Sequence, residues 1–173
     1  MYKSVDGGAS WKNMGLKSSE HIGNILIHPE NSDIVYVSAY GPLWNKGGDR
    51  GIYKTIDGGK SWNKILFIDE HTGFNEIHMD PRNPDVLYAT SHQRRRHVYT
   101  YVGGGPGSGI HKSVDGGNTW RKINKGLPGV EIGRIGMDIS DANPEVIYAI
   151  VEASERKGGF YKSTNRGESL SLI

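Results

Sequence analysis

The stretch Thr55-Ile56-Asp57-Gly58-Gly59-Lys60-Ser61-Trp62 decides the fold, because versions of it occur four times along the chain. The other copies occupy residues 4–11, 113–120 and 163–170, and in the last one Asn165 and Leu170 replace the aspartate and the tryptophan. The Asp or Asn positions are 6, 57, 115 and 165, which gives spacings of 51, 58 and 50 residues. A repeat of about fifty residues predicts an architecture built from one repeated supersecondary unit.

We call this eight-residue stretch the box, and a second motif precedes each of its last three copies. It covers residues 27–36, 79–88 and 141–148, and consists of a Pro, Asn and Asp cluster followed by β-branched residues and a tyrosine. The cluster is typical of turns, and the residues after it are typical of strands. In the first complete unit we therefore expect strand A at 22–28, strand B at 34–39, strand C at 51–55 and strand D at 61–66. Antiparallel units of four strands, repeated at this interval, predict the blades of a β-propeller.

The number of units is uneven. Residues 1–16 supply only strands C and D, whereas residues 20–68, 72–124 and 131–173 supply three complete blades. Propellers close their ring with about 4–8 blades, so three and a half blades predict an open arc. We expect a segment of a longer protein, with a partial propeller that assembles with itself as the alternative. In both cases the open blade faces need a partner, either further blades or another chain.

Composition excludes several classes of function. The chain of 173 residues has no cysteine, which excludes disulfides and cysteine zinc sites. A net charge of +2 gives no global field for nucleic acid or membranes. No apolar run is long enough for membrane insertion, and no signal peptide is visible, because Met1 leads directly into Tyr2-Lys3-Ser4. The scattered histidines lack the spacing of a zinc motif, so we expect neither metals nor cofactors.

The repeated box is expected to be structural. Its glycines supply the positive φ angles of a hairpin turn between strands C and D, and its aspartate accepts backbone N–H groups within that turn. The preceding Ser or Thr adds a local hydrogen bond, and the tryptophan is expected to bury its ring between blades. A residue needed once per blade is architectural rather than catalytic or calcium-binding. The structural positions are Ser4, Asp6, Gly8, Trp11, Thr55, Asp57, Gly59, Trp62, Ser113, Asp115, Gly117, Trp120, Ser163, Asn165 and Gly167.

These boxes resemble the Asp-box, or bacterial neuraminidase repeat, over essentially the whole chain. The matching stretches are residues 51–62, 104–109 and 133–136. The repeat occurs in sialidases, xyloglucan-cleaving glycosidases and sortilin-type receptors, and this chain is most similar to secreted bacterial proteins with a sortilin-like propeller, often labelled "glycosyl hydrolase, BNR repeat". The resemblance implies an all-β partial propeller and a secreted or periplasmic location. It leaves the activity open, because the group contains both enzymes and binding proteins.

The candidate site lies on the face formed by the B–C and D–A connections, here called the top face. The box turns lie on the opposite, bottom face, and variable loops are where ligands usually bind. The top-face loops are 40–50, 68–73, 90–109 and 152–159. Trp44 is the only tryptophan that the repeat does not explain, and aromatic residues with arginines are typical of binding surfaces. The candidate ligand-binding residues are Tyr40, Trp44, Asp49, Arg50, Asp69, Glu70, His92, Arg94, Arg95, Arg96, Tyr99 and Tyr101.

Each candidate group also has a structural interpretation. The aromatic residues could fill the top of the central channel or pack against a neighbouring blade. The run Arg94-Arg95-Arg96 could bind carboxylates or phosphates, or it could be a solvated loop near Asp69 and Glu70. The run is too short, in a nearly neutral chain, to indicate nucleic-acid binding.

Three functions remain open at this point. The leading hypothesis is a non-catalytic module that binds peptide, protein or glycan through the top face. The second is a fragment of a glycoside hydrolase, with half of an active site at Asp49, Asp69 or Glu70, since such enzymes need two carboxylates flanking one bond. No spacing distinguishes these acids from ordinary loop acids, and the arginine motif of sialidases is absent, so the chain is expected to lack catalytic residues. The third hypothesis is a structural subunit of a larger complex.

Overall fold

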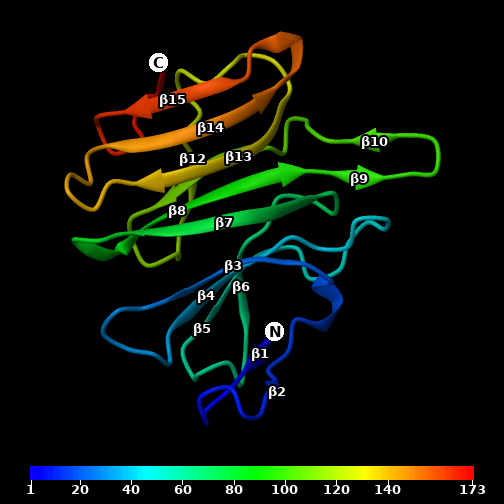
Figure 1. The fold of residues 1–173 in the computed structure, drawn as a ribbon, viewed down its shortest axis with the longest axis vertical. Helices are drawn as coiled ribbons and strands as arrows, with labels where there is room; N and C mark the ends of the chain where they lie inside the picture. Colours follow the sequence, from blue (N-terminus) through cyan, green and yellow to red (C-terminus); the bar gives the residue numbers. More distant parts are fainter.

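The computed structural model describes all residues from 1 to 173 and contains sixteen strands in five antiparallel sheets. Three of the sheets have four strands each, and they follow one another along the chain like the blades of an arc (Figure 1). The only helical segments are the 3₁₀ turns η1 (Lys17–Ser19) and η2 (Ser154–Arg156), so no helix could cross a membrane. The predicted all-β partial propeller of four-stranded antiparallel blades is confirmed.

The first two units match the order of strands expected from the sequence. A half blade consists of β1 (Tyr2–Lys3) and β2 (Lys12–Asn13), which form a separate two-stranded sheet. In the first blade, the sheet order is β3-β4-β5-β6. Its strands are β3 (Ile22–Ile27), β4 (Val35–Ala39), β5 (Gly51–Thr55) and β6 (Asn63–Leu66).

The second blade contains an insertion between its strands B and C, and the third blade is regular. The sheet of the second blade is formed by β7 (Thr72–Asp80), β8 (Asn83–Gln93), β11 (Gly109–Ser113) and β12 (Arg121–Lys122). The insertion is a hairpin of β9 (Arg95–Arg96) and β10 (Tyr101–Val102), which projects from the side of the arc in Figure 1. The third blade is formed by β13 (Ile132–Ile139), β14 (Ile147–Ala153), β15 (Gly159–Ser163) and β16 (Ser171–Leu172).

The core lies between the blades. One cluster joins the second and third blades, with Tyr88, Ile110, Ile135 and Ile147 all at most 1% exposed. A smaller cluster joins the first and second blades, and includes Tyr36, Ile52, Phe74 and Leu87, again at most 1% exposed. Because each cluster contains residues from two successive blades, apolar burial holds the three complete blades together.

The box forms a closed hydrogen-bonded turn, as the sequence predicts. In the second copy, Thr55 Oγ1 donates to Asp57 Oδ1 at 2.7 Å, and Gly59 N donates back to Thr55 Oγ1 at 2.9 Å. Asp57 Oδ1 also accepts the backbone N–H of Ser61 at 3.0 Å. Gly58 and Gly59 have φ angles of +71° and +92°, which a residue with a Cβ adopts only with strain. The box is therefore a turn between strands C and D that its own hydrogen bonds stabilise.

The tryptophans of the boxes are less buried than expected. Trp62 is half-buried, and its Nε1 donates to Met14 O of the preceding half blade at 2.6 Å. Trp120 is half-buried against the smaller core cluster. Trp11, however, is 63% exposed and bonds only within its own turn, at Gly8 O. The expectation of a ring buried between blades is wrong for Trp11, because no inner strands of its own blade are present to cover it.

A lysine ladder links the successive blades, and sequence reasoning missed its role. The Nζ of Lys3 donates to Gly58 O at 3.2 Å, and that of Lys54 donates to Gly116 O at 2.9 Å. Lys112 Nζ donates to Arg166 O at 2.8 Å. Each of these three lysines of strand C therefore binds the box turn of the next blade. The sequence showed these lysines only as a periodic strand pattern.

The fourth box keeps its hydrogen bonds despite its changed residues. Asn165 Oδ1 accepts from Ser163 Oγ at 2.8 Å and from the Ser169 backbone N–H at 3.0 Å. Arg166 stands where the other boxes have glycine, at a φ of +57°. Its guanidinium donates to the buried Asp80 carboxylate of the preceding blade at 3.0 Å. The decayed box is thus tied to its neighbour by an ion pair that the other boxes lack.

Candidate functional site

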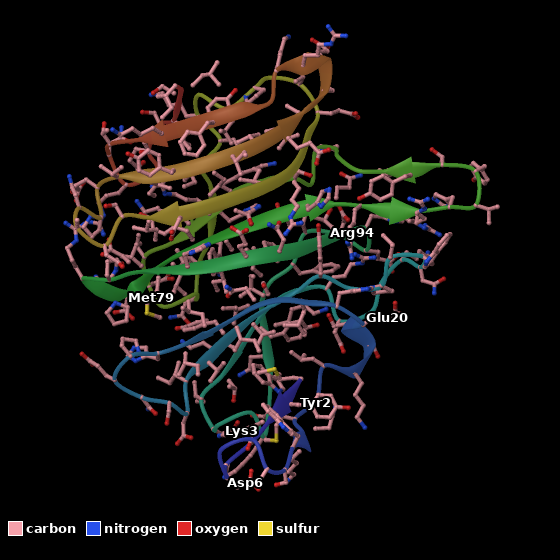
Figure 2. All side chains as sticks on the ribbon, viewed as in Figure 1. Tyr2, Lys3, Asp6, Glu20, Met79 and Arg94 are labelled. Carbon is pink, nitrogen blue, oxygen red and sulfur yellow. The ribbon has the colours of Figure 1, made fainter.

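Three connections meet on the top face and bond to one another through backbone atoms. Gly47 N of the first B–C loop donates to Glu70 O of the D–A loop at 2.8 Å. Arg96 N donates to Leu43 O at 2.9 Å, which joins the β9–β10 hairpin to the first B–C loop. In Figure 2, Arg94 lies on this side of the molecule, whereas Met79, beside an A–B turn, lies on the opposite side. The loops therefore form one continuous surface.

The first side-chain cluster on this surface is Tyr40, His92 and Arg94. Tyr40 and His92 are nearly buried, and the Tyr40 hydroxyl bonds to His92 Nδ1, while His92 Nε2 lies 3.0 Å from Gly103 O. Burial lowers the pKa of His92 and raises that of Tyr40. The neutral histidine can then accept a hydrogen bond from the Tyr40 hydroxyl at Nδ1 and donate one from Nε2 to Gly103 O, so the pair holds the loop in place.

Arg94 lies against the Tyr40 ring of this cluster. Its Cζ is 3.6 Å from the centre of the Tyr40 ring, a close cation–π contact. Its Nε and Nη2 atoms are buried without a hydrogen-bond partner in the protein, and it takes part in no salt bridge. The cation–π contact therefore anchors the guanidinium, while two of its nitrogen atoms are enclosed by the protein without an acceptor.

The second cluster is more open and lies at the base of the hairpin. The guanidinium of Arg96 lies 6.0 Å from the ring of Trp44 and 5.7 Å from that of Tyr101. The two rings are 54% and 48% exposed. At the tip of the hairpin, Tyr99 is 86% exposed and packs only on His97. Arg95 pairs with Val102 in the hairpin, and its Nε has no partner.

Arg50 has a different environment from the other candidate arginines. Its side chain is fully buried, and its guanidinium donates to the carbonyl oxygens of Tyr40 at 2.8 Å, of Asn45 at 3.0 Å and of Pro42. Gly41, at a φ of +79°, leaves the space for it, because a Cβ there would collide with the Arg50 side chain. Arg50 therefore organises the first B–C loop from inside and presents no N–H group to solvent.

The candidate acids are all engaged in local contacts. Asp49 Oδ2 accepts the Ser18 backbone N–H at 2.9 Å, and Asp69 Oδ1 accepts the His71 backbone N–H at 2.7 Å. Glu70 forms a salt bridge with Lys46 at 3.3 Å. Asp69 thus stabilises its own turn, Asp49 ties the first B–C loop to Ser18, and Glu70 pairs with Lys46 of the first B–C loop. No group of three or more His, Asp and Glu side chains is arranged to hold a metal ion.

Arg134 is a further residue of this surface that sequence reasoning did not single out. It is exposed on β13, and its positive charge acts on both Tyr40 and His92 by favouring the tyrosinate and the neutral imidazole. Its backbone N–H donates to Glu152 Oε2 at 3.2 Å. The only sequence signal was its position in Gly133-Arg134-Ile135-Gly136, where an arginine lies between glycines on an inner strand.

Comparison with known protein families identifies a match over most of the chain. The family model described as "Sortilin, neurotensin receptor 3", named Sortilin-Vps10, matches residues 1–164. No curated protein matches the chain significantly.

Solved structures share the fold at low sequence identity. An ancestral GH74 enzyme has a TM-score of 0.70 at 21% identity, covering 99% of this chain and 21% of that one. The GH74 xyloglucanase from Xanthomonas campestris has a TM-score of 0.77 at 14% identity, with 99% and 26% covered. YCF48 from Cyanidioschyzon merolae has a TM-score of 0.57 at 19% identity, with 94% and 42% covered. The chain therefore spans about a fifth to two fifths of these structures.

Proposed function

Because this chain belongs to the Sortilin-Vps10 family of β-propellers, we propose that it is a non-catalytic binding module whose top face takes up an acidic ligand. The observation that carries the proposal is the set of arginines on this face, Arg94, Arg95 and Arg96, none of which has a carboxylate partner. The ligand is a peptide, a protein segment or a glycan that bears carboxylate groups.

The stacking of the arginines supports binding rather than solvation. Tyr40 anchors Arg94 through a cation–π contact, and Trp44 and Tyr101 flank Arg96 at 6.0 and 5.7 Å, so the exposed guanidinium of Arg96 remains open to hydrogen bonds. A guanidinium held on an aromatic ring loses little further freedom when it forms a bidentate pair with a carboxylate. The exposed rings of Trp44 and Tyr101 add apolar area beside the charge.

The same surface argues against glycoside hydrolysis by this chain. A hydrolase needs one carboxylic acid and one carboxylate flanking the bond. Asp49 and Asp69 cap backbone N–H groups and Glu70 pairs with Lys46, so none of them stands free beside another. The likeness to GH74 structures, at 21% identity or less, concerns the fold alone.

Calorimetric titration with a soluble poly-glutamate peptide tests the proposal. We expect binding that weakens with salt and falls at least about tenfold in Arg96→Ala, since a bidentate pair contributes on the order of 1.5–3 kcal/mol. Arg156→Ala, an exposed arginine in the third B–C loop, serves as the matched control and should leave the affinity unchanged. Equal effects of both variants, or no binding, would contradict the proposal, as would release of reducing sugar from xyloglucan by the chain.

Family membership also leads us to propose a secreted or periplasmic location. Fractionation of the native cells tests this, and recovery of the protein in the cytoplasm alone would contradict it.

A further inference from the structure

Two aromatic rings and one arginine form an open surface on the top face, at the base of the β9–β10 hairpin (Figure 1). Trp44 of the first B–C loop and Tyr101 of β10 flank the guanidinium of Arg96, with 6.0 and 5.7 Å from its Cζ to the ring centres. The two aromatic residues are 54% and 48% exposed, and Arg96 is exposed as well. We call these three residues the platform, which offers aromatic surface and a cation side by side.

The platform is held in place from both of the loops that form it. The backbone N–H of Arg96 donates to Leu43 O at 2.9 Å, which ties the hairpin to the residue before Trp44. The buried guanidinium of Arg50 donates to Asn45 O at 3.0 Å, the carbonyl group of the residue after Trp44. A ligand that binds to such a fixed surface orders few groups of the protein, so little free energy is lost on binding.

The platform carries a positive charge that no acid of the protein compensates. Residues 90–109 contain no Asp or Glu, and Arg96 takes part in no salt bridge. Glu70, an acid of the neighbouring D–A loop, is paired with Lys46 at 3.3 Å. An exposed guanidinium binds a carboxylate through two parallel hydrogen bonds. The group that the platform recognises is therefore an anion of this kind.

The shape of this surface does not suit a peptide. Peptides bind folded domains mainly by adding a strand to a sheet edge or by entering a groove. The outer strand of the hairpin, β10, has only two residues. An apolar groove of about 360 Å³ is lined by Tyr2, Trp11 and Trp62 among others, and none of its lining residues belongs to the top-face loops. A peptide therefore finds no long strand edge and no apolar groove at the platform.

A sugar ring suits the platform better. The C–H groups on one face of a pyranose ring pack against an aromatic ring, because the aromatic face is partially negative and the C–H groups are partially positive. Such packing needs an open aromatic face rather than a groove. A uronic acid also carries a carboxylate at the edge of its ring, within reach of the guanidinium that both aromatic rings flank.

We propose that the platform binds an acidic polysaccharide built from uronic acid residues. This inference rests on the proposed function of the top face as a binding surface for acidic ligands, and it selects the glycan among the ligands named there. Sugar rings of one oligosaccharide stack on Trp44 and Tyr101, and a carboxylate of the same oligosaccharide pairs with Arg96. The charge gives the affinity its dependence on uronic acid, and the two rings distinguish a sugar from other polyanions.

Calorimetric titration of the full chain with oligogalacturonate tests the inference, with its fully methyl-esterified form and poly-glutamate as comparison ligands. We expect oligogalacturonate to bind at least about tenfold more tightly than the uncharged ester. Arg96→Ala should weaken the binding of both charged ligands. Trp44→Ala and Tyr101→Ala should each weaken the binding of oligogalacturonate at least about fivefold and change that of poly-glutamate less than about twofold, because only the sugar stacks on the rings.

Two further variants serve as controls. Tyr101→Phe keeps the aromatic ring and should retain the affinity for oligogalacturonate. Phe67→Ala removes a ring of similar exposure, 47%, which has the Lys64 Nζ 4.7 Å from its centre but lies outside the platform. This variant should leave both affinities unchanged. Thermal unfolding midpoints show whether each variant is folded.

The outcomes separate this inference from the function on which it rests. Binding of poly-glutamate that depends on Arg96, without binding of oligogalacturonate, would overturn the glycan and leave the acidic-ligand function standing. Equal losses for both ligands in the ring variants would do the same, because the rings would then only hold Arg96 in place. Equal affinity for the ester, or tighter binding of single-stranded DNA that depends on the rings, would also overturn the inference. If neither charged ligand binds, both proposals are wrong.

Discussion

The carboxylate of the box aspartate accepts three or more hydrogen bonds on a small surface turn. In the second box, Asp57 Oδ2 also accepts from Ser61 Oγ at 2.6 Å. Hydrogen bonds from Ser61 are the main cause of the lowered pKa of Asp57. The corresponding hydrogen bonds from Ser10 and Thr119 lower the pKa values of Asp6 and Asp115 to about 2. The charged form is therefore the one that the turn stabilises.

We expect Asp57→Ala to lower the thermal unfolding midpoint by several degrees, since it leaves the Ser61 and Lys60 backbone N–H groups without their acceptor. Asp57→Asn should cost much less, because Asn165 keeps the corresponding bonds in the fourth box. Circular dichroism melts of the two variants measure the difference. An equal loss in both would show that the charge matters more than the hydrogen bonds.

His111 makes stability depend on pH in a window that the aspartates do not share. It is buried on β11 against Phe74, with Nε2 3.0 Å from Ser91 Oγ, and burial lowers its pKa from the usual 6.5 to about 4. The unfolded chain then binds more protons than the folded chain between these two values, so stability is complete above pH 6.5 and falls as the pH decreases towards 4.

The shift corresponds to a loss of roughly 3 kcal/mol across that window. Urea unfolding at several pH values measures it. His111→Tyr introduces the residue that occupies the same register in the other blades, Tyr53 and Tyr161. It should reduce the slope and leave the part due to His92, whose pKa burial also lowers. His97→Gln, in the hairpin tip, is the control, and an unchanged slope in His111→Tyr would contradict the assignment.

At the scale of the elements, the lysine ladder joins strand C of one blade to the box of the next. Lys54 contributes a hydrogen bond to Gly116 O and a cation–π contact with Tyr36. Lys162 occupies the same register on β15 and keeps only the contact with Tyr148. The two lysines therefore separate the contribution within a blade from the contribution between blades.

We expect Lys54→Met to destabilise the chain by about 1–2 kcal/mol, the net value of one charged hydrogen bond and one partly exposed cation–π contact. Lys162→Met should cost about half as much or less. Chemical unfolding compares the two, and an equal loss would mean that the bond to the next blade contributes nothing.

Sequence patterns predicted the elements well and the site less well. The Asp-Gly-Gly turn and the Pro-Asn cluster are local signals, and they fixed the strands of the first blade to within two residues, including β5 at 51–55. The loop residues carry no periodic signal. Arg50 therefore looked like a surface arginine, although it is buried among carbonyl groups contributed by its own loop. The pairing of Arg166 with Asp80 depends on residues 86 positions apart, which no local pattern reveals.

At the scale of the whole molecule, the third blade shows an apolar face that the other blades cover. Ile150 is 63% exposed and Phe160 is 46% exposed. At the register of Phe160, Ile52 and Ile110 are fully buried by the blade that follows them. Neighbouring apolar residues exposed on a flat sheet indicate a contact surface.

The double variant Ile150→Thr and Phe160→Thr should therefore reduce self-association and the binding of a hydrophobic dye. Its unfolding midpoint should change little, because neither side chain fills the core. Light scattering and dye fluorescence measure both effects. The matched variant Ile52→Thr should instead lower the midpoint strongly, and a similar loss in the double variant would contradict this view of the face.

The ladder has one more consequence. Lys3, Lys54 and Lys112 each reach one blade forward and no further, so energetic coupling passes only between nearest neighbours. A structure coupled in this way behaves as a one-dimensional array, whose stability grows by a similar increment with each unit and whose end units fray first. Such an array can gain or lose whole units without changes to the contacts within the remaining units.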